Sequence, residues 1–279
     1  MKDILLDSIY AAIEAGKIIN NIYRTDFDVT TKSDNTPVTL ADKLSGKKII
    51  EFLKHHKLPI IGEEESFFPE STTAETGTSD ETLPDTYFIV DPLDGTREFI
   101  KRNGEFTVNI ALIENGEPIM GVVHAPAISL LYFALKHFGS YKLSEHNIRK
   151  LQLNENYSLN SILEMSEKLP IYNLPGTYTI VTSRSHLDEK TMGYINQKRK
   201  EHSLIECIHI GSSIKMCWLA EGKAHEYPRF GRTMEWDTAA AHAILKEAGG
   251  NILDARYMQP LKYNKKNFEN PDFVAYAVY

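Results

Sequence analysis

Short stretches of this 279-residue chain place acidic side chains where they could hold a metal ion. The most informative is DPLDGT at residues 91–96. The apolar run at 87–90 leads to Asp91, a proline then ends the strand, and Asp94 follows in a tight turn closed by glycine. Two carboxylates at the end of a buried strand repel each other unless a cation lies between them. Magnesium prefers such oxygen ligands. The alternative is an Asp-rich turn whose carboxylates cap local backbone N–H groups.

Three further acidic motifs could complete such a site. Glu63 lies in GEEE, directly after an apolar run at 58–61, and Asp237 lies in EWDT, where a helix is predicted to begin. Asp42 ends TLAD, which matches a helix-capping pattern. Each motif alone favours a structural role, as the start of an acidic loop or as a helix cap. The repetition of an apolar strand that ends in carboxylates favours a metal site.

Several basic side chains could bind a small anion. His186 follows SRS in a predicted loop, Lys215 lies in the first turns of a predicted helix, and Arg229 follows a predicted strand at 224–227. The alternative for Lys215 and Arg229 is a solvated charge or a surface ion pair worth under about 1 kcal/mol. The pair His55–His56 is predicted to lie on a solvated helix face.

Composition and charge exclude several classes of protein. The chain has 31 Lys and Arg against 38 Asp and Glu, a net charge of −7, and eight of the acids lie between residues 62 and 85. No strongly basic domain is present, so a nucleic-acid polymer is not the expected partner. Two cysteines exclude a disulfide scaffold. The first 23 residues fit neither a signal peptide nor a membrane span, and no apolar run of about 18 residues occurs. We expect a cytoplasmic protein.

The pattern of apolar residues predicts an α/β protein with an α+β N-terminal half and an α/β C-terminal half. Helices are expected over 1–23, 39–56, 186–200, 212–221 and 238–248, and strands over 58–61, 87–91, 107–113, 118–124, 130–135, 178–182 and 204–210. A turn or hairpin is expected over 30–37, a hairpin turn at Asn115–Gly116, and an exposed loop over 66–85. The polar stretch 144–175 is interpreted as a junction, which divides the chain into subdomains 1–155 and 156–279.

The combined motifs resemble a known superfamily. GEEE, DPLDGTREFI and WDTAAAHAILKEAGG, in this order and at these distances, resemble the lithium-sensitive, magnesium-dependent phosphatases, which include inositol monophosphatases, fructose-1,6-bisphosphatases and 3′(2′),5′-bisphosphate nucleotidases. DPLDGTREFIKRNGEFTVNIALI, SRSH, GSSIK and YPRFG look most like the CysQ-type nucleotidases. The resemblance runs from the first helix to the last strand. It implies the layered αβαβα architecture of these sugar-phosphatase-like enzymes.

The resemblance also implies roles for individual residues. Ligands for two or three Mg²⁺ ions would be Glu63, Asp91, Asp94, Asp237 and the backbone carbonyl of Leu93. Thr96 would pair with Glu63 to orient and deprotonate the attacking water, while Asp42 would help to hold a further water. The substrate would contact the N–H groups of Gly95 and Thr96, and also His186, Ser212, Lys215, Arg229 and Asp237.

The implied activity is hydrolysis of adenosine 3′,5′-bisphosphate to AMP and phosphate, with the 2′,5′ isomer and 3′-phosphoadenylylsulfate as related substrates. One alternative is an inositol-monophosphatase-like enzyme that acts on polyol or sugar phosphates. Another is a non-catalytic protein that holds Ca²⁺ with the same carboxylates. Thr96 beside the acids favours catalysis. A monomer or a homodimer is expected, and peripheral contact with the inner face of the plasma membrane is left open.

Overall fold

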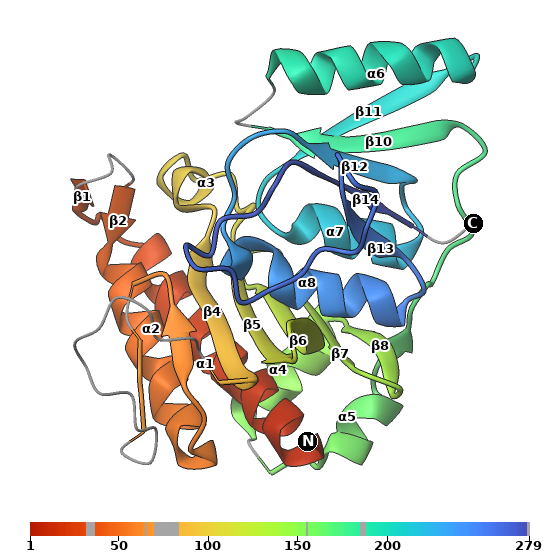
Figure 1. Cartoon of the computed structure of the whole chain (residues 1–279). Helices are drawn as coiled ribbons and strands as arrows, with labels where there is room; N and C mark the ends of the chain where they lie inside the picture. The colour runs from red at the N-terminus through yellow and green to blue at the C-terminus, as the bar shows by residue number, and fades with distance from the viewer. Residues whose placement is uncertain (32–36, 65, 70–83, 155, 185–187, 278–279) are drawn as a thin grey trace.

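Two β-sheets and the helices packed on their faces form the frame of the protein (Figure 1). The computed structural model describes residues 1–31, 37–64, 66–69, 84–154, 156–184 and 188–277. Within these residues, one sheet has seven strands in the order β3-β4-β5-β6-β7-β8-β9, and the other has five in the order β11-β10-β12-β14-β13. A separate two-stranded pair, β1 (Val29–Thr31) and β2 (Pro37–Thr39), fits the hairpin expected near 30–37; residues 32–36 lie outside the described ranges.

The seven-stranded sheet is antiparallel except for its first pair. Its strands are β3 (Ile60–Gly62), β4 (Thr86–Asp94), β5 (Thr107–Glu114), β6 (Glu117–Ala125), β7 (Leu130–Leu135), β8 (Gly139–Leu143) and β9 (Glu167–Lys168). Strand β3 runs parallel to β4, so the carboxyl ends of these two strands lie at the same edge. The predicted Asn115–Gly116 turn is confirmed, since both residues have positive φ (51° and 72°), as a two-residue hairpin turn requires.

The five-stranded sheet mixes parallel and antiparallel pairs. Its strands are β10 (Tyr178–Ser183), β11 (Ile205–Ile210), β12 (Glu226–Arg229), β13 (Asn251–Asp254) and β14 (Phe273–Tyr276). Strand β10 is parallel to β11 and β12, and β14 is antiparallel to β12 and β13. The strand predicted over 224–227 corresponds to β12, which begins and ends two residues later. Arg229 is thus the last residue of the strand and does not follow it, as was predicted.

Helices separate and cover the two sheets. Helix α1 (Lys2–Tyr23) packs on one face of the seven-stranded sheet beside α2 (Leu40–Leu53), which the short 3₁₀ helix η1 (Lys54–His56) continues. Between the sheets lie α7 (Ile214–Glu221) and α8 (Glu235–Glu247), and α6 (Glu189–Glu201) covers the outer side of the second sheet (Figure 1). These five layers confirm the expected α/β, αβαβα architecture. No helix among the described residues is long and apolar enough to cross a membrane.

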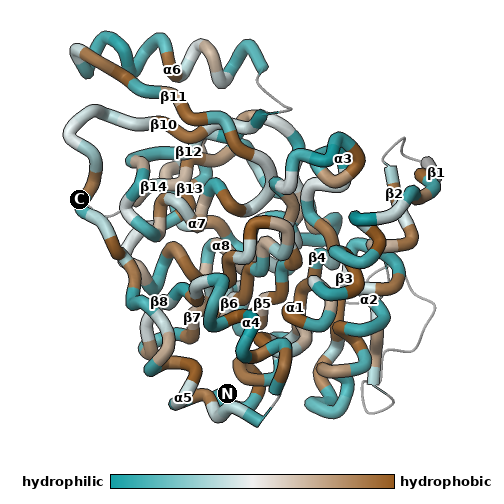
Figure 2. Tube along the Cα trace, turned by 180° about the vertical axis from the view of Figure 1, so that it is seen from behind, coloured by the Kyte–Doolittle hydropathy of each residue, from teal (hydrophilic) through white to brown (hydrophobic). Residues whose placement is uncertain are grey.

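Two hydrophobic clusters lie on opposite faces of the seven-stranded sheet. Along β4, Phe88 and Val90 belong to the cluster that includes residues of α1 and α2, whereas Tyr87 and Ile89 belong to the cluster that includes residues of α7 and α8. This alternation follows from the two-residue period of a strand. In contrast to β4, which is buried on both faces, helix α6 is largely hydrophilic (Figure 2), because it packs on the sheet by one side only.

Residues 144–175 contain regular structure that the polar sequence did not predict. They form α4 (Glu145–Leu153), α5 (Leu159–Glu164) and β9. Strand β9 pairs with β8, so the first sheet extends past residue 155. The division into subdomains 1–155 and 156–279 stays a prediction.

An exposed loop was expected over 66–85. Residues 70–83, which make up most of it, lie outside the described residues. The remaining helix, α3 (Thr96–Ile100), directly follows β4.

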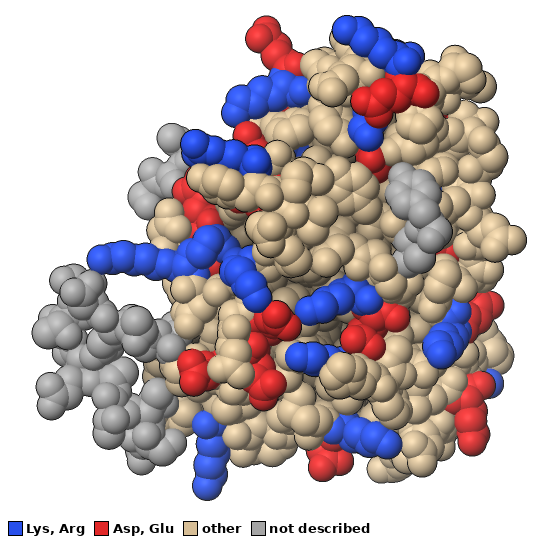
Figure 3. Space-filling view, turned by 45° about the vertical axis from the view of Figure 1, so that its right-hand side comes forward, with Lys and Arg blue, Asp and Glu red and all other residues tan. Residues whose placement is uncertain are grey.

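On the face shown in Figure 3, acidic and basic side chains are interspersed. This distribution agrees with the sequence analysis, which found no strongly basic domain.

Candidate active site

A bulge at the end of β4 brings Asp91 and Asp94 to the same site. Asp91 pairs with Asn109 of β5 and Asp94 pairs with Thr107, so three steps along β4 oppose two steps along β5. The extra residue re-aims the strand, as bulges beside active sites commonly do. Gly95, the N-cap of α3, then adopts φ 89°, a backbone conformation that a residue with a side chain rarely adopts.

Helix α8 supplies the third acid of the cluster. Carboxylate oxygens of Asp91, Asp94 and Asp237 lie within 4.8 Å of one another. Asp237 is not the N-cap of α8, which was the structural alternative for this residue. The helix begins at Glu235, and Asp237 is its third residue, where Oδ2 accepts a 2.7 Å hydrogen bond from the Met234 N–H. Its carboxylate therefore stabilises the start of the helix and also belongs to the cluster.

The pKa values of these acids show how unfavourable the cluster is without a cation. Burial raises the pKa of Asp94 to about 6 and that of Asp237 to about 8, where the charge of Asp94 contributes as well. The pKa of Asp91 is raised by burial and by the charges of Glu63, Asp94 and Asp237. Three carboxylates this close together, that of Asp91 buried and those of Asp94 and Asp237 partly buried, fit a hard divalent cation, because they offer it only oxygen ligands. Glu63, which directly follows β3, lines the same cavity.

Thr96 and Asp42 are in contact beside the acid cluster. The Thr96 hydroxyl donates to Asp42 Oδ1 at 3.2 Å and lies 3.3 Å from the Leu93 carbonyl. Asp42 also completes the predicted capping box of α2, since its Oδ2 accepts from the Thr39 N–H at 2.7 Å and from the Thr39 hydroxyl at 2.6 Å. Burial raises the pKa of Asp42. The resemblance implied a pair of Thr96 with Glu63; in the structure Asp42 accepts this hydroxyl hydrogen bond.

Ser213 connects the acid cluster to the layer of the second sheet, a role that the sequence analysis missed. Its backbone N–H donates to Asp94 Oδ2 at 2.6 Å. Its hydroxyl lies 2.8 Å from the Thr107 hydroxyl and donates to Asn109 Oδ1 at 2.7 Å. The available signal was the pair Thr107 and Asn109, two polar residues on one face of β5, whose other residues up to Ile113 are apolar.

A second missed contact joins the two layers at the rim of the site. Arg184 donates through Nε and Nη2 to the two carboxylate oxygens of Glu105, at 2.7 and 2.6 Å. The same carboxylate accepts from the Gly211 N–H at 2.8 Å. These hydrogen bonds of the Glu105 carboxylate position Gly211, which lies in the segment that leads into α7.

The predicted anion-binding residues that the structure describes lie at the same cavity. Lys215 is buried, and its ammonium donates to the Ser212 carbonyl at 2.5 Å and lies 3.4 Å from the Ile210 carbonyl. Burial lowers the pKa of Lys215 to about 8, against the opposing effect of Asp94. Arg229, at the end of β12, donates to the Arg232 carbonyl at 3.1 Å. His186 lies outside the described residues.

One cavity of about 240 Å³ contains this arrangement. Its walls include nearly all the predicted site residues that the structure describes: Glu63, Asp91, Leu93, Asp94, Gly95, Thr96, Ser212, Lys215, Arg229 and Asp237. Asp42 contacts it through Thr96. Acidic groups come mainly from the end of β4 and the start of α8, and the predicted anion-binding residues Lys215 and Arg229 come from α7 and β12. An anion that needs both a cation cluster and basic side chains therefore fits this cavity.

Comparison with known proteins agrees with this geometry. The model of the inositol monophosphatase family matches residues 3–273. The 3′(2′),5′-bisphosphate nucleotidase CysQ of Escherichia coli (strain K12) is 39% identical over 267 residues, which is 94% of this chain and 95% of that protein. The CysQ of Haemophilus influenzae is 32% identical over 270 residues, 94% of this chain and 88% of that one.

Solved structures give the same result. The crystal structure of CysQ from Bacteroides thetaiotaomicron superposes with a TM-score of 0.84 at 41% identity, over 99% of this chain and 98% of that one. An inositol monophosphatase from Anabaena, at 20% identity and a TM-score of 0.65 over 98% of this chain and 89% of that one, shares the fold. The chain belongs to the inositol monophosphatase family.

Proposed function

We propose that this protein is a metal-dependent 3′(2′),5′-bisphosphate nucleotidase that removes the 3′-phosphate of adenosine 3′,5′-bisphosphate to give AMP and phosphate. The observation that carries the proposal is the single cavity in which the acids of β4 and α8 face Lys215 and Arg229. The names of the relatives that are 39% identical support the same activity. The 2′,5′ isomer and 3′-phosphoadenylylsulfate are proposed as related substrates.

The carboxylates would hold two or three Mg²⁺ ions. The proposed ligands are Glu63, Asp91, Asp94, Asp237 and the Leu93 carbonyl, all of which line the cavity. When bound, such ions stabilise charge on the phosphoryl oxygens and lower the pKa of water. The carboxylates themselves would fix the positions of the ions, and the Ser213 N–H would hold Asp94 in its orientation.

Thr96 and Asp42 would move the proton of the attacking water. Because the Thr96 hydroxyl donates to Asp42, its oxygen can accept a hydrogen bond from a water molecule. As the water attacks phosphorus, its proton would pass to Thr96 while the hydroxyl proton of Thr96 passes to Asp42. The bond from phosphorus to the 3′ oxygen breaks in the same displacement, and the leaving 3′ oxygen would take a proton from solvent water, which gives AMP and phosphate. The raised pKa of Asp42 makes this carboxylate a better proton acceptor. The N–H groups of Gly95 and Thr96, at the start of α3, would hold phosphate oxygens.

Lys215, Arg229 and Ser212 would recognise the 5′-phosphate, and His186, which follows β10 in the sequence, would contribute as well. Each charge-assisted hydrogen bond to phosphate is worth about 1.5–3 kcal/mol. A substrate with one phosphate would leave these groups without their ligand, which favours the bisphosphate over polyol phosphates.

Phosphate release tests this proposal. The full-length protein is assayed on adenosine 3′,5′-bisphosphate, AMP, inositol 1-phosphate and fructose 1,6-bisphosphate, each with Mg²⁺ and with EDTA. We expect Mg²⁺-dependent turnover, with the highest kcat/KM on the adenosine bisphosphate and negligible release from AMP. Higher kcat/KM on inositol phosphate would instead support the polyol phosphatase alternative. No release from any substrate with Mg²⁺ would contradict the proposed enzyme.

The cytoplasmic location, the monomeric or homodimeric state and the peripheral membrane contact stay predictions from the sequence.

A further inference from the structure

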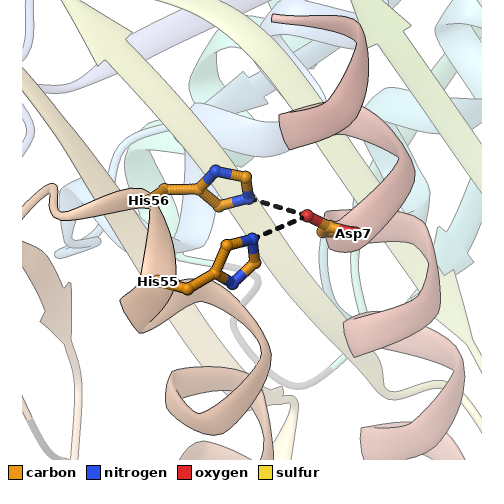
Figure 4. A group of neighbouring side chains, drawn as sticks. All are labelled: Asp7, His55 and His56. Carbon is orange, nitrogen blue, oxygen red and sulfur yellow. Dashed lines mark ion pairs between the residues drawn. The ribbon is translucent and has the colours of Figure 1, made fainter.

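A second group of metal-ligating side chains lies between α1 and the end of α2 (Figure 4). Asp7 comes from α1, and His55 and His56 come from η1. Asp7 Oδ2 lies 3.2 Å from His55 Nε2 and 2.9 Å from His56 Nε2. In Figure 4 both imidazoles point their Nε2 atoms at this one carboxylate oxygen. The sequence analysis predicted only a solvated helix face here, so the convergence on Asp7 is a result of the structure.

Two ion pairs do not account well for this geometry. For both histidines to donate to Asp7 as cations, two positive rings would have to lie with centroids 4.0 Å apart. The Nε2 atom of His56 is shielded from solvent and has no well-aligned hydrogen-bond partner among the described residues, although Asp7 is close. A neutral imidazole in this position has a nitrogen lone pair available for coordination.

We propose that Asp7, His55 and His56 bind one divalent transition-metal ion, with Zn²⁺ as the physiological candidate. Zinc accepts imidazole nitrogen and carboxylate oxygen at about 2.0–2.2 Å. Ligand atoms around one tetrahedral zinc are therefore about 3.3 Å apart, close to the observed 2.9 and 3.2 Å. His55 is 60% exposed, so water can complete the coordination.

The surrounding backbone charge also favours a cation. The two histidines lie at the carboxyl end of α2 and η1, where the helix dipole is negative.

This site is separate from the candidate active site. Helix α2 begins beside Asp42 and has 14 residues, so its two ends are about 20 Å apart at 1.5 Å per residue. The ligand types differ as well, since imidazole selects zinc, copper and nickel, whereas Mg²⁺ prefers oxygen. A bound ion would join α1 to the end of α2 and stabilise the folded protein without entering the reaction.

The test is a Zn²⁺ titration of the full-length protein in excess Mg²⁺, followed by calorimetry and by metal analysis after dialysis. Wild type is compared with His55→Gln, His56→Gln and Asp7→Asn, and with His146→Gln, which changes an exposed histidine on α4 as a matched control. We expect the two His variants to bind one Zn²⁺ fewer per chain, or to bind it at least tenfold more weakly, whereas His146→Gln behaves as wild type. Zn²⁺ should raise the Tm of wild type and of His146→Gln, and not that of His55→Gln, His56→Gln or Asp7→Asn.

The acids of the active site could also bind Zn²⁺, so the titration is repeated in Asp94→Asn protein. The double variant with Asp94→Asn and His56→Gln should still bind Zn²⁺ less well than the single variant Asp94→Asn. Equal Zn²⁺ stoichiometry and affinity in wild type and both His variants would overturn the proposal. If His56→Gln does not fold, Co²⁺ is added to Asp94→Asn protein, where visible bands of a nitrogen-ligated ion support the site and their absence overturns it.

Discussion

At the scale of single residues, Asp94 has the most contacts within the acid cluster. Its Oδ2 accepts from the Ser213 N–H at 2.6 Å and lies 3.5 Å from both Thr107 Oγ1 and Asn109 Nδ2. We expect Asp94→Asn to lower kcat by more than about 100-fold, since loss of an outer partner of a metal site alone costs 10–100-fold. The Tm should stay equal or rise, because one of three mutually repelling carboxylates is removed. Asp3→Asn, at an exposed acid of α1, is the control for turnover and circular dichroism. Near wild-type turnover of Asp94→Asn would contradict the assignment.

Asp237 makes the stability of the metal-free protein depend on pH. Its folded-state pKa of about 8 lies above the usual value near 4, so the folded state binds a proton that the unfolded state has released. Stability from this group is therefore present at low pH and falls as pH rises from about 4 to about 8. In EDTA, the Tm of Asp237→Asn relative to wild type should be higher at pH 8 than at pH 5. His124 and His242, whose pKa values are lowered to about 4, cancel in this difference. A difference independent of pH would refute the prediction.

At the scale of secondary-structure elements, the close approach of α8 to β6 positions Asp237. Gly121 of β6 has no room for a side chain, because an added Cβ would lie 2.1 Å from the Ala240 carbonyl of α8. Gly121→Ala must push α8 away from the sheet, at a cost of about 1–3 kcal/mol. That cost corresponds to a Tm lower by several degrees.

The same variant should lose activity as well as stability, since α8 carries a proposed metal ligand. Gly193→Ala in α6 is the matched control, because an added Cβ there meets no atom within 4 Å. It should be neutral or slightly stabilising, as Ala favours a helix over Gly. Thermal melts and kcat at saturating Mg²⁺ measure both effects. Wild-type values for Gly121→Ala would show that this contact does not position the site.

At the scale of the whole molecule, the layers of the two sheets contribute different chemistry to one cavity. The acids come from the seven-stranded sheet and α8, whereas Lys215 and Arg229 come from α7 and β12. Lys215→Ala and Arg229→Ala should therefore reduce kcat/KM for adenosine 3′,5′-bisphosphate by roughly 10- to 100-fold. The loss should be much smaller for 3′-AMP, which lacks the 5′-phosphate. Lys190→Ala, at an exposed residue of α6, is the control. Equal losses on both substrates would show that Lys215 and Arg229 act at the acid cluster and do not recognise the 5′-phosphate.

The sequence by itself determined the features that depend on a few neighbouring residues. The capping box of Thr39 and Asp42, the Asn115–Gly116 turn and the strand that carries Asp91 all follow from local backbone preferences and short hydrogen bonds. The predicted end of that strand at Asp91 was wrong, because a bulge lets β4 continue through Pro92 to Asp94. Periodic apolar residues also predicted most helices and strands, because burial of one or both faces requires that pattern. Within 144–175 the sequence did not predict α4 and α5, because each helix buries few apolar side chains and the stretch is mostly polar.

Only the tertiary structure decided which distant groups meet. Asp237 joins Asp94 because α8 packs between the sheets, and the Ser213 N–H reaches Asp94 because α7 begins at the same edge. A backbone N–H has no sequence signature, and neither has the contact of Thr96 with Asp42. Likewise, the histidines of η1 meet Asp7 through the packing of α1 on α2. Such contacts depend on how buried faces of separate elements fit together, which no local pattern of residues specifies.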